Sequence, residues 1–270
     1  MNNHISDSDF ELFKKLMYDS AGIFLSDAKK ILVANRLNKR LRELNIDSHN
    51  KYYYICKKSN DEKWKCNESL TTNETFFYRE PKHWDFLENK FIPEITGKVN
   101  PEKKFDLKIW SCASSTGEEP YTIAMLLKEK LMNFANITFQ ITATDINEKV
   151  IAFAKNGIYE QRRVEQLPKN LLLKYFTVNS QQYKISADIK KGVQFKKHNL
   201  MEQLKNEKFD LIVCRNVLIY FDDLHKKKVI ANLKNNLNPG GYLFLGHSEG
   251  IANIDNDFKF ISASIYKFLK

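Results

Sequence analysis

The sequence contains few cysteines and few glycines, and it lacks a long hydrophobic run. The four cysteines, Cys56, Cys66, Cys112 and Cys214, have neither a close pair nor the spacing of a zinc site, which predicts reduced thiols. The longest apolar runs, such as 217–221, are too short to cross a bilayer, and the polar, acidic N-terminus does not resemble a signal peptide. These absences predict a cytoplasmic protein that does not insert into a membrane.

Positive charge prevails over negative charge in the composition. The chain has 43 Lys and Arg against 33 Asp and Glu, which gives a formal net charge of +10. A basic protein attracts acidic partners. Nucleic acid and an acidic protein surface satisfy the same electrostatics, so composition alone does not distinguish between them.

The hydrophobic pattern of the 270 residues changes near the polar, proline-containing stretch 100–104. Before it, apolar residues recur at helical spacing, as in 10–17, and a second helix is expected from about Ser26. After it, short apolar runs alternate with helical segments, which predicts an α/β domain with a mainly parallel sheet. The assignment is a helical region with its linker at 1–90, an α/β domain at 91–270 and, where the alternation is interrupted, an antiparallel insert at 157–199.

The helix expected from about Ser26 is strongly basic. Its apolar residues Ile31, Leu32, Leu37 and Leu41 are expected to face inward, and Lys29, Arg36, Lys39, Arg40 and Arg42 are expected to face largely outward. This basic face is a candidate docking surface for an acidic partner. A solvated charged face without a partner is the alternative.

The α/β domain is expected to carry polar residues where its strands end. Strands are predicted at 107–112, 138–143, 209–214, 241–246 and 261–268. Sheets of this kind bind ligands at the carboxyl ends of their strands, near the point where the strand order reverses. The segments that follow the first three strands, 113–119, 144–145 and 215–216, are therefore the candidate binding loops.

The first two candidate loops are acidic. Asp145 is suited to accept hydrogen bonds from two ribose hydroxyls, whereas Glu119 would repel a phosphate and suit a cationic cofactor such as S-adenosylmethionine. Each residue has a structural alternative. Thr116 and Glu119 have the spacing of a helix capping box, with Pro120 in the first turn. Asp145 could instead be an N-cap residue or form an Asx turn that leads into the next helix.

Five blocks of sequence carry a specific resemblance. They are TTNETFFYRE (71–80), WSCASSTGEEPYTIA (110–124), TATDINEKVIAFAKNGIY (142–159), CRNVLIYF (214–221) and LNPGGYLFLGHSE (237–249). In their order and spacing, from about Phe10 to the C-terminus, the chain resembles the chemotaxis receptor methyltransferases, the CheR family. The resemblance implies a Rossmann-like class I S-adenosylmethionine-dependent methyltransferase domain, preceded by a helical docking domain and carrying a small inserted antiparallel β-subdomain.

The resemblance also implies the activity, the partner and the site. The family transfers a methyl group from S-adenosylmethionine to glutamate carboxylates on the cytoplasmic methylation helices of chemoreceptors and leaves S-adenosylhomocysteine. The implied cofactor-binding residues are Asn73, Thr75, Arg79, Glu119, Asp145, Asn199, Leu200, Arg215 and Asn216. Arg79 and Tyr220 match the positions most often assigned to the reaction. Arg36, Lys39, Arg40 and Arg42 match the basic helix that faces the receptor.

The chemistry of glutamate methylation can be argued from the residues alone. A glutamate side chain has a pKa of about 4.3, so it is ionised at neutral pH and needs no general base. The enzyme then has to position the reactants and exclude water. Arg79 is expected to orient the incoming carboxylate and Tyr220 to line the methyl's path, and neither a metal nor a catalytic triad is expected. Arg79 could instead be a structural surface arginine, and Tyr220 a plain core tyrosine.

Two other functions share the cofactor. A nucleic-acid methyltransferase acting on exocyclic amines often carries an Asn/Asp-Pro-Pro-Tyr/Phe signature where this chain has 215–218, Arg-Asn-Val-Leu, so no nucleic acid partner is expected. A non-catalytic S-adenosylmethionine-sensing signalling module is the remaining alternative.

The insert is compact, with a polar turn at 178–182 that lacks glycine, so we expect an enzyme independent of a C-terminal receptor pentapeptide. We also expect a monomer.

Overall fold

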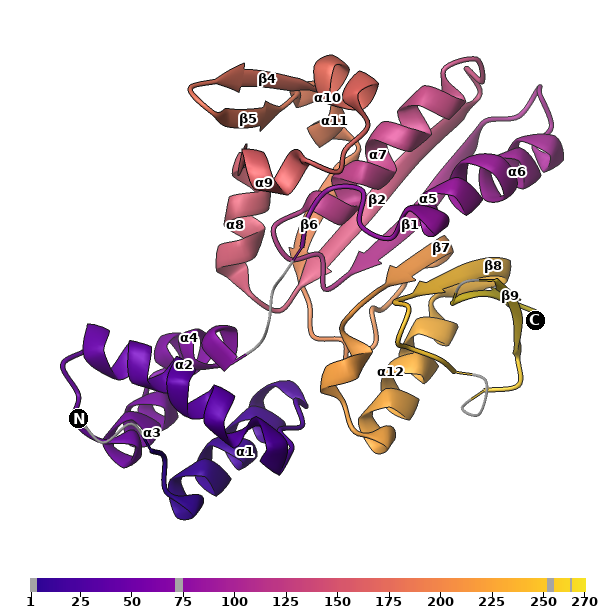
Figure 1. The fold of residues 1–270 in the computed structure, drawn as a ribbon. Coiled ribbons are helices and arrows are strands. Elements are labelled where there is room, and N and C mark those ends of the chain that lie inside the picture. Colours follow the sequence, from indigo (N-terminus) through magenta and orange to yellow (C-terminus); the bar gives the residue numbers. More distant parts are fainter. Residues whose placement is uncertain (1–3, 71–74, 252–254, 263) are drawn as a thin grey trace. The chain divides into compact units, whose positions relative to one another are not determined.

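The computed structural model describes residues 4–70, 75–251, 255–262 and 264–270, and the chain forms two compact units (Figure 1). The helical unit comprises Met1–Glu74 together with Ile219–Lys226. The sheet unit comprises Thr75–Leu218 together with Lys227–Lys270. Among the described residues, none of the helices combines the length and the apolar character that a membrane span needs.

The helical unit is a small bundle around its own core. Its elements are α1 (Asp7–Ala21), the short helix η1 (Asp27–Lys29), α2 (Lys30–Glu43), α3 (His49–Lys58) and α4 (Asn60–Leu70). The first helix begins where the Ser6 hydroxyl accepts a hydrogen bond from the Asp9 amide at 3.0 Å, and it ends at Gly22 in the left-handed region. The core includes Phe13, Leu37, Tyr52 and Cys66, so residues from all four α-helices bury one common apolar centre.

The predicted orientation of α2 is partly wrong. Leu37 and Leu41 are buried as expected, but Ile31 is 75% exposed and Leu32 is 43% exposed. The buried stripe of the helix also includes Val33, and positions 33, 37 and 41 follow one another at four-residue spacing. Ile31 and Leu32 lie off this stripe, so the first turn of α2 presents apolar side chains to solvent.

The sheet unit begins before the expected boundary at residue 90. Its first helices are α5 (Pro81–Phe86), the wider turn η2 (Leu87–Phe91) and α6 (Ile92–Lys98). Trp84, Leu87 and Phe91 are buried in the same core as Leu127 of the α/β domain. These side chains need the sheet unit to cover them, which is why the two units divide near residue 75.

The main sheet has seven strands in the order β6-β2-β1-β7-β8-β10-β9. In chain order they are β1 (Phe105–Cys112), β2 (Ile137–Asp145), β6 (Val193–Lys197), β7 (Phe209–Cys214), β8 (Leu237–Leu245), β9 (Phe258–Ser262) and β10 (Ile265–Phe268). The first five are parallel, and β10 runs antiparallel to both β8 and β9. The strand order reverses between β1 and β7, which confirms the expected Rossmann-like arrangement.

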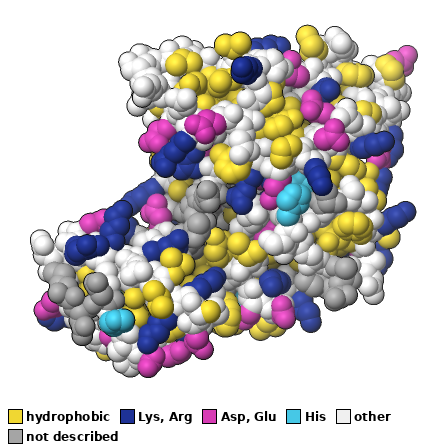
Figure 2. All heavy atoms as spheres, viewed as in Figure 1, with side chains coloured by type: hydrophobic (Ala, Val, Ile, Leu, Met, Phe, Trp, Pro, Cys, Tyr) yellow, Lys and Arg dark blue, Asp and Glu magenta, His cyan; other side chains and the backbone are white. Residues whose placement is uncertain are grey.

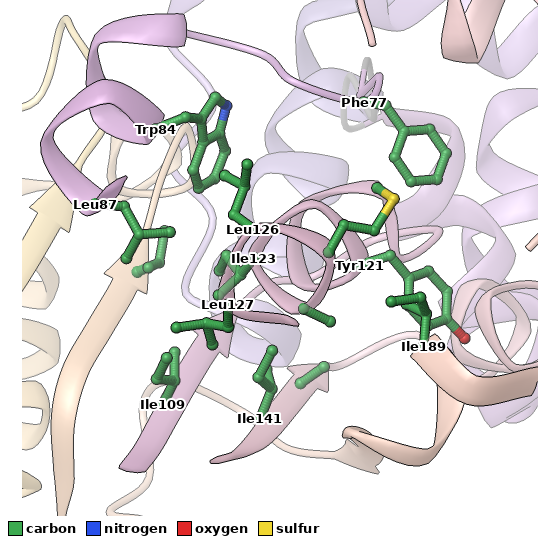
Figure 3. Packing of buried hydrophobic residues seen from close by; sticks show 14 of the residues in the cluster. Phe77, Trp84, Leu87, Ile109, Tyr121, Ile123, Leu126, Leu127, Ile141 and Ile189 are labelled. Atoms are coloured by element: carbon green, nitrogen blue, oxygen red, sulfur yellow. The ribbon is translucent and has the colours of Figure 1, made fainter. Parts of the chain in front are cut away.

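The helices α7 (Glu118–Leu131), α8 (Glu148–Asn156) and α12 (Asp223–Asn235) are those predicted between the strands. Figure 3 shows how α7 lies against β1 and β2, with Ile123 and Leu127 directed toward Ile109 and Ile141 of the sheet. These side chains are fully buried, and each contributes roughly 1.5–3 kcal/mol of hydrophobic stabilisation. This core fixes the first turn of α7 at the end of β1.

The last strand prediction differs from the structure. The run predicted as one strand at 261–268 belongs to two antiparallel strands, β9 and β10, which pair with each other. Ser264 has φ +62°, a left-handed conformation that turns the chain between them. Because apolar residues lie on both sides of the turn, the hydrophobic pattern did not reveal that the chain reverses direction there.

The expected insert is present as a second, three-stranded antiparallel sheet. Its strands are β3 (Ile158–Glu160), β4 (Phe176–Asn179) and β5 (Gln182–Ile185), and α9 (Gln161–Val164), α10 (Lys169–Tyr175) and α11 (Ala187–Lys191) accompany them. Between β4 and β5, Ser180 and Gln181 have φ +45° and +67°, as a two-residue type I′ hairpin turn requires. The strand β6, which the sequence grouped with the insert, instead pairs with β2 at the edge of the main sheet.

Candidate active site

Three strands bring the predicted binding loops to one edge of the main sheet. Cys112 at the end of β1 is in register with Thr144 of β2 on one side and with Cys214 of β7 on the other. The loop after Cys112, the residue Asp145 and the pair 215–216 therefore lie at adjacent strand ends. This is the place where an open α/β sheet binds its ligand.

The loop between β1 and α7 is tightly wound. Ala113, Ser115 and Gly117 all have positive φ, at +48°, +48° and +93°. The Ser114 amide donates to the carbonyl oxygen of Thr144 at 2.8 Å. A Cβ atom on Gly117 would lie 2.9 Å from the Cβ of Ala154, so the single glycine of this loop is needed for close packing.

Asp145, at the end of β2, links the second candidate loop to the loop that follows β1. Its Oδ2 accepts a hydrogen bond from the Ser115 amide at 2.8 Å, and its Oδ1 accepts one from the Asn147 amide at 2.9 Å. The second bond forms the Asx turn that the sequence left open, and Asn147 is the N-cap of α8. Since a carboxylate oxygen has more than one acceptor position, these bonds are compatible with binding to ribose hydroxyls.

Glu119 is not part of a capping box. The N-cap of α7 is Gly117, and no side chain caps it. The carboxylate of Glu119 instead accepts hydrogen bonds from the Ser111 hydroxyl at 2.8 Å and from Nη1 of Arg215 at 3.0 Å. Burial raises the pKa of Glu119 above its usual range, although the positive charge of Arg215 opposes this shift. The capping-box interpretation is therefore wrong, and the carboxylate is directed into the site.

Arg215 holds several parts of the site together. Its side chain is 2% exposed, and its Nη2 donates to the carbonyl oxygen of Arg79 at 2.8 Å. The guanidinium also contacts Glu80 at 3.2 Å and lies 5.0 Å from the ring centroid of Trp84. Burial is the largest single influence on Glu80 and favours its neutral form, but the charge and hydrogen bond of Arg215, together with His83 and His247, outweigh it and lower the pKa of Glu80. The side chain of Arg215 thus positions Glu119 and the 79–80 segment.

The linker residues 75–80 run past the start of α7. Arg163 of the insert holds this segment twice, because its side chain donates to the Thr75 carbonyl oxygen and its own carbonyl oxygen accepts from the Phe77 amide at 2.9 Å. The Phe77 ring packs within the sheet unit, and the guanidinium of Arg79 lies 5.8 Å from the ring centroid of Phe76. The backbone that leads to Arg79 is therefore held in place by these contacts. Asn73 lies outside the described residues.

Asn199 and Leu200 follow the edge strand β6. The preceding residue, His198, donates its backbone amide to the carbonyl oxygen of Asp145 at 2.9 Å, which places this pair beside the second loop. Asn199 makes its own Asx turn by accepting from the Met201 amide at 3.0 Å, and Leu200 is buried. The predicted cofactor residues at positions 119, 145, 199, 200, 215 and 216 thus gather at adjacent strand ends.

Tyr220 belongs to the helical unit. It ends the short helix η3 (Leu218–Tyr220), and its carbonyl oxygen accepts a hydrogen bond from the Phe24 amide at 2.7 Å. Its ring is partly exposed, with the Lys29 ammonium 5.7 Å from the ring centroid. The alternative of a plain core tyrosine at the end of an apolar strand is therefore wrong.

The four candidate docking residues on α2 have different surroundings. Arg36 donates to the carbonyl oxygen of Leu70 at 2.9 Å, and Arg40 makes a two-pronged ion pair with Glu62 at 2.7 and 2.9 Å. Lys39 and Arg42 are exposed. The outward face of α2 consequently exposes Lys39 and Arg42, whereas Arg36 and Arg40 also connect α2 to α4.

The site fits S-adenosylmethionine in two respects. Glu119 and Asp145 supply carboxylates near the first loop, which suit an ammonium group and ribose hydroxyls. The Oγ atoms of Ser114 and Ser115 are buried, and the described part of the chain offers no hydrogen-bond partner to either. Buried hydroxyls in a ligand loop without partners from the protein are available to a bound molecule.

Sequence reasoning missed three residues that organise the site. Glu80 contacts Arg215, Arg163 fixes the linker, and the carboxylate of Glu249 accepts a hydrogen bond from the Asn216 amide at 2.8 Å. Glu80 and Glu249 end two of the five blocks quoted above, so their positions were visible. Their partners lie 135 and 33 residues away in the sequence, and only the fold brings them together.

Comparison with known proteins identifies the family. The all-alpha domain of CheR methyltransferases matches residues 8–71, and their SAM binding domain matches residues 73–267. A chemotaxis protein methyltransferase of Borreliella burgdorferi is 38% identical over 273 residues, covering 99% of this chain and 96% of the relative. Chemotaxis protein methyltransferase 2 of Vibrio cholerae is 35% identical, covering 94% of this chain and 89% of the relative. A chemotaxis protein methyltransferase of Salmonella typhimurium is 33% identical, covering 98% and 92%.

The two matched domains have the same order along the chain as the helical unit and the sheet unit of the structure. The acidic residues near the strand ends suit the cofactor that the second domain binds. The chain therefore belongs to the CheR methyltransferase family, and residues 73–267 are its S-adenosylmethionine-binding domain.

Proposed function

We propose that this protein transfers a methyl group from S-adenosylmethionine to glutamate side-chain carboxylates of chemoreceptors, giving glutamate methyl esters for sensory adaptation. The observation that carries the proposal is that the carboxylates of the candidate site already have ion-pair or hydrogen-bond partners within the protein. Glu119 and Glu80 pair with Arg215, and Asp145 accepts two backbone amides. A site whose own carboxylates are occupied in this way favours a substrate that needs no proton removed, and an ionised glutamate is such a substrate.

The reaction needs little acid–base chemistry. When bound, S-adenosylmethionine supplies a methyl group activated by a sulfonium, so the carboxylate oxygen gains the methyl, the sulfur keeps the electron pair and no proton moves. The chain's own residues have to hold the reactants in line and exclude water. We assign cofactor binding to Asn73, Thr75, Arg79, Glu119, Asp145, Asn199, Leu200, Arg215 and Asn216.

We propose that Arg79 orients the reacting carboxylate and that Tyr220 lines the path of the methyl group. A guanidinium is suited to a carboxylate because its planar donors match both oxygens. The course of the 79–80 segment is fixed by Arg215, which supports a defined position for Arg79. For Tyr220, the aromatic ring excludes water without taking part in proton transfer.

We propose that the exposed face of α2 docks the acidic methylation helices of the receptor. Lys and Arg side chains are spread over the face of the molecule seen in Figure 2 and alternate with Asp and Glu, so the net charge alone does not define a docking surface. The α2 face does, because Lys39 and Arg42 are exposed there and the apolar Ile31 lies in the first turn. Opposite charge raises the association rate and fixes orientation.

The remaining proposals concern setting and assembly. We place the reaction in the cytoplasm, with the enzyme acting as a monomer and independently of a C-terminal receptor pentapeptide. The compact two-residue turn between β4 and β5 supports the last point. Calorimetric titration with receptor C-terminal pentapeptides tests it, and micromolar affinity would contradict it.

The decisive experiment is incubation with methyl-labelled S-adenosylmethionine and purified receptor cytoplasmic domains. Base-labile label released as methanol identifies a carboxyl ester, and receptor domains with methylatable glutamates changed to alanine provide the control. Label on RNA or DNA would favour nucleic-acid methylation. Cofactor binding without transfer to any receptor would favour a sensing module.

A further inference from the structure

The turn that follows β7 is held by a buried carboxylate from another loop. Glu249, in the loop after β8, is 5% exposed. Its Oε2 accepts hydrogen bonds from the backbone amides of Asn216 at 2.8 Å and Gly246 at 2.7 Å. Its Oε1 accepts one from the Leu218 amide at 2.7 Å. One side chain thus satisfies three main-chain donors from two loops.

The turn needs such support because its conformation is unfavourable by itself. Asn216 has φ +56°, in the left-handed region that residues other than glycine adopt only uncommonly. The residue before it, Arg215, directs its guanidinium to Glu119. The amides on either side of Val217 both point to the same carboxylate, so Glu249 determines the course of the backbone through this turn.

The packing around Gly246 shows how closely the two loops meet. A Cβ atom at this position would lie 2.7 Å from Oε2 of Glu249, 2.8 Å from Nδ2 of Asn216 and 2.9 Å from its backbone nitrogen. A Cβ atom essentially never makes contacts this short, and all three involve groups that are held in place by hydrogen bonds. The absence of a side chain at Gly246 is therefore part of the same arrangement.

We propose that Glu249 is a positioning residue for S-adenosylmethionine binding, acting through the Arg215–Leu218 turn. The proposal rests on the assignment of Arg215 and Asn216 to the cofactor site, and it does not depend on which substrate is methylated. Glutamine cannot replace the carboxylate. If its oxygen faces Asn216 and Gly246, its NH₂ group meets the donor amide of Leu218, and the reverse orientation opposes two donors.

Glu249→Gln tests the proposal, with titration calorimetry of S-adenosylhomocysteine and a melting curve on the full chain. We expect the dissociation constant to rise at least tenfold. The matched control is Asn236→Ala, because Asn236 is also buried and its side-chain amide donates to the carbonyl oxygens of Leu204 at 2.6 Å and Glu207 at 2.7 Å. Asn236 precedes β8, at the amino-terminal edge of the sheet, so its loss should lower the melting temperature and leave the dissociation constant within twofold of wild type.

A second variant, Gly246→Ala, disturbs the same arrangement without removing a charge, and it should also weaken binding at least tenfold. Binding within twofold of wild type in Glu249→Gln, or equal weakening in Asn236→Ala, would overturn the proposal. So would a failure of both Glu249→Gln and Gly246→Ala to fold, because Glu249 would then be required for the fold itself. Since no receptor is present in this assay, failure of the proposed receptor methylation would leave its result unaffected.

Discussion

Arg215 and Glu119 form an ion pair, with Nη1 of the arginine 3.0 Å from Oε2 of the glutamate. Glu119 lies in the first turn of α7 and Arg215 directly follows β7, 96 residues away in the sequence. The pair keeps the Glu119 carboxylate oriented although burial raises its pKa. The ion pair therefore fixes the position of the Glu119 carboxylate, a group that suits a cationic cofactor, beside the loop that follows β1.

Glu119→Gln should weaken binding of S-adenosylmethionine by about 10- to 100-fold, because a charge-assisted hydrogen bond contributes roughly 1.5–3 kcal/mol. The pH dependence should change as well. In the wild type, affinity is full above the pKa of Glu119 and falls as the pH is lowered through it. Because burial raises this pKa, the fall should begin at a higher pH than for an ordinary glutamate. Titration calorimetry from pH 8 to pH 5 measures both effects.

The neighbouring carboxylate provides the control for this prediction. Glu118 is fully buried, and it interacts with the Thr116 hydroxyl at 2.7 Å and with Arg163 at 3.3 Å. Glu118→Gln should lower stability yet keep the pH dependence of cofactor binding. If Glu119→Gln bound the cofactor with an unchanged pH profile, the role of Glu119 as the titrating group would be disproved.

Gly117→Ala should destabilise the protein by roughly 2–4 kcal/mol and weaken cofactor binding. The left-handed conformation at φ +93° is unfavourable for alanine, and the new Cβ would lie 2.9 Å from that of Ala154. Gly97→Ala is the matched control. A Cβ there meets nothing within 4 Å, and alanine favours the helix α6, so stability should stay equal or rise by up to about 1 kcal/mol. Urea unfolding of both variants measures the difference, and equal midpoints would contradict the prediction.

The sequence was sufficient to predict the central strands of the sheet and the edge at which their following loops meet, although β6 and the separation of β9 from β10 were missed. Apolar runs of strand length ended at polar residues, and parallel strands bring their carboxyl ends to one edge, so the 113–119, 145 and 215–216 segments were expected to meet. Their contact through the Ser114 amide and the Thr144 carbonyl oxygen agrees with this. Local patterns suffice here because strand periodicity and loop position are local properties.

The partners of individual side chains could not be predicted in this way. The spacing of Thr116 and Glu119 suggested a capping box, but a left-handed Gly117 became the N-cap and Glu119 turned to Arg215. Ile31 was expected inside, but the buried stripe of α2 depends on which of its faces meets α4. In both cases a tertiary contact decided between conformations that the local sequence allows.

Arg40→Met should lower the free energy of unfolding by roughly 2–4 kcal/mol, because it leaves Glu62 buried without its main partner. The pair also predicts an acid dependence. Hydrogen bonds from Arg40 lower the pKa of Glu62 to about 2 from an ordinary 4.5, so its stabilisation is present above pH 4.5 and is lost as the pH falls toward 2. Urea unfolding at pH 6 and pH 3 should show a smaller loss in Arg40→Met than in the wild type.

Arg42→Met is the control for this change. Arg42 is exposed on the same helix, so its replacement should alter stability by less than about 0.5 kcal/mol and keep the acid dependence of the wild type. Similar destabilisation by the two variants would contradict a specific role of the Arg40–Glu62 pair.

Charge reversal on α2 tests the docking surface. The pair Lys39→Glu and Arg42→Glu removes exposed cations and leaves the Arg40–Glu62 ion pair intact, so receptor methylation should slow by about tenfold or more at low salt, with the defect shrinking as salt is raised. Affinity for S-adenosylmethionine should not change. The control pair, Lys57→Glu and Lys58→Glu, makes the same change in charge on exposed residues in the last turn of α3. Because net charge is then equal in both double variants, a defect confined to the α2 pair would locate docking on that face, and equal defects would reduce it to a general electrostatic effect.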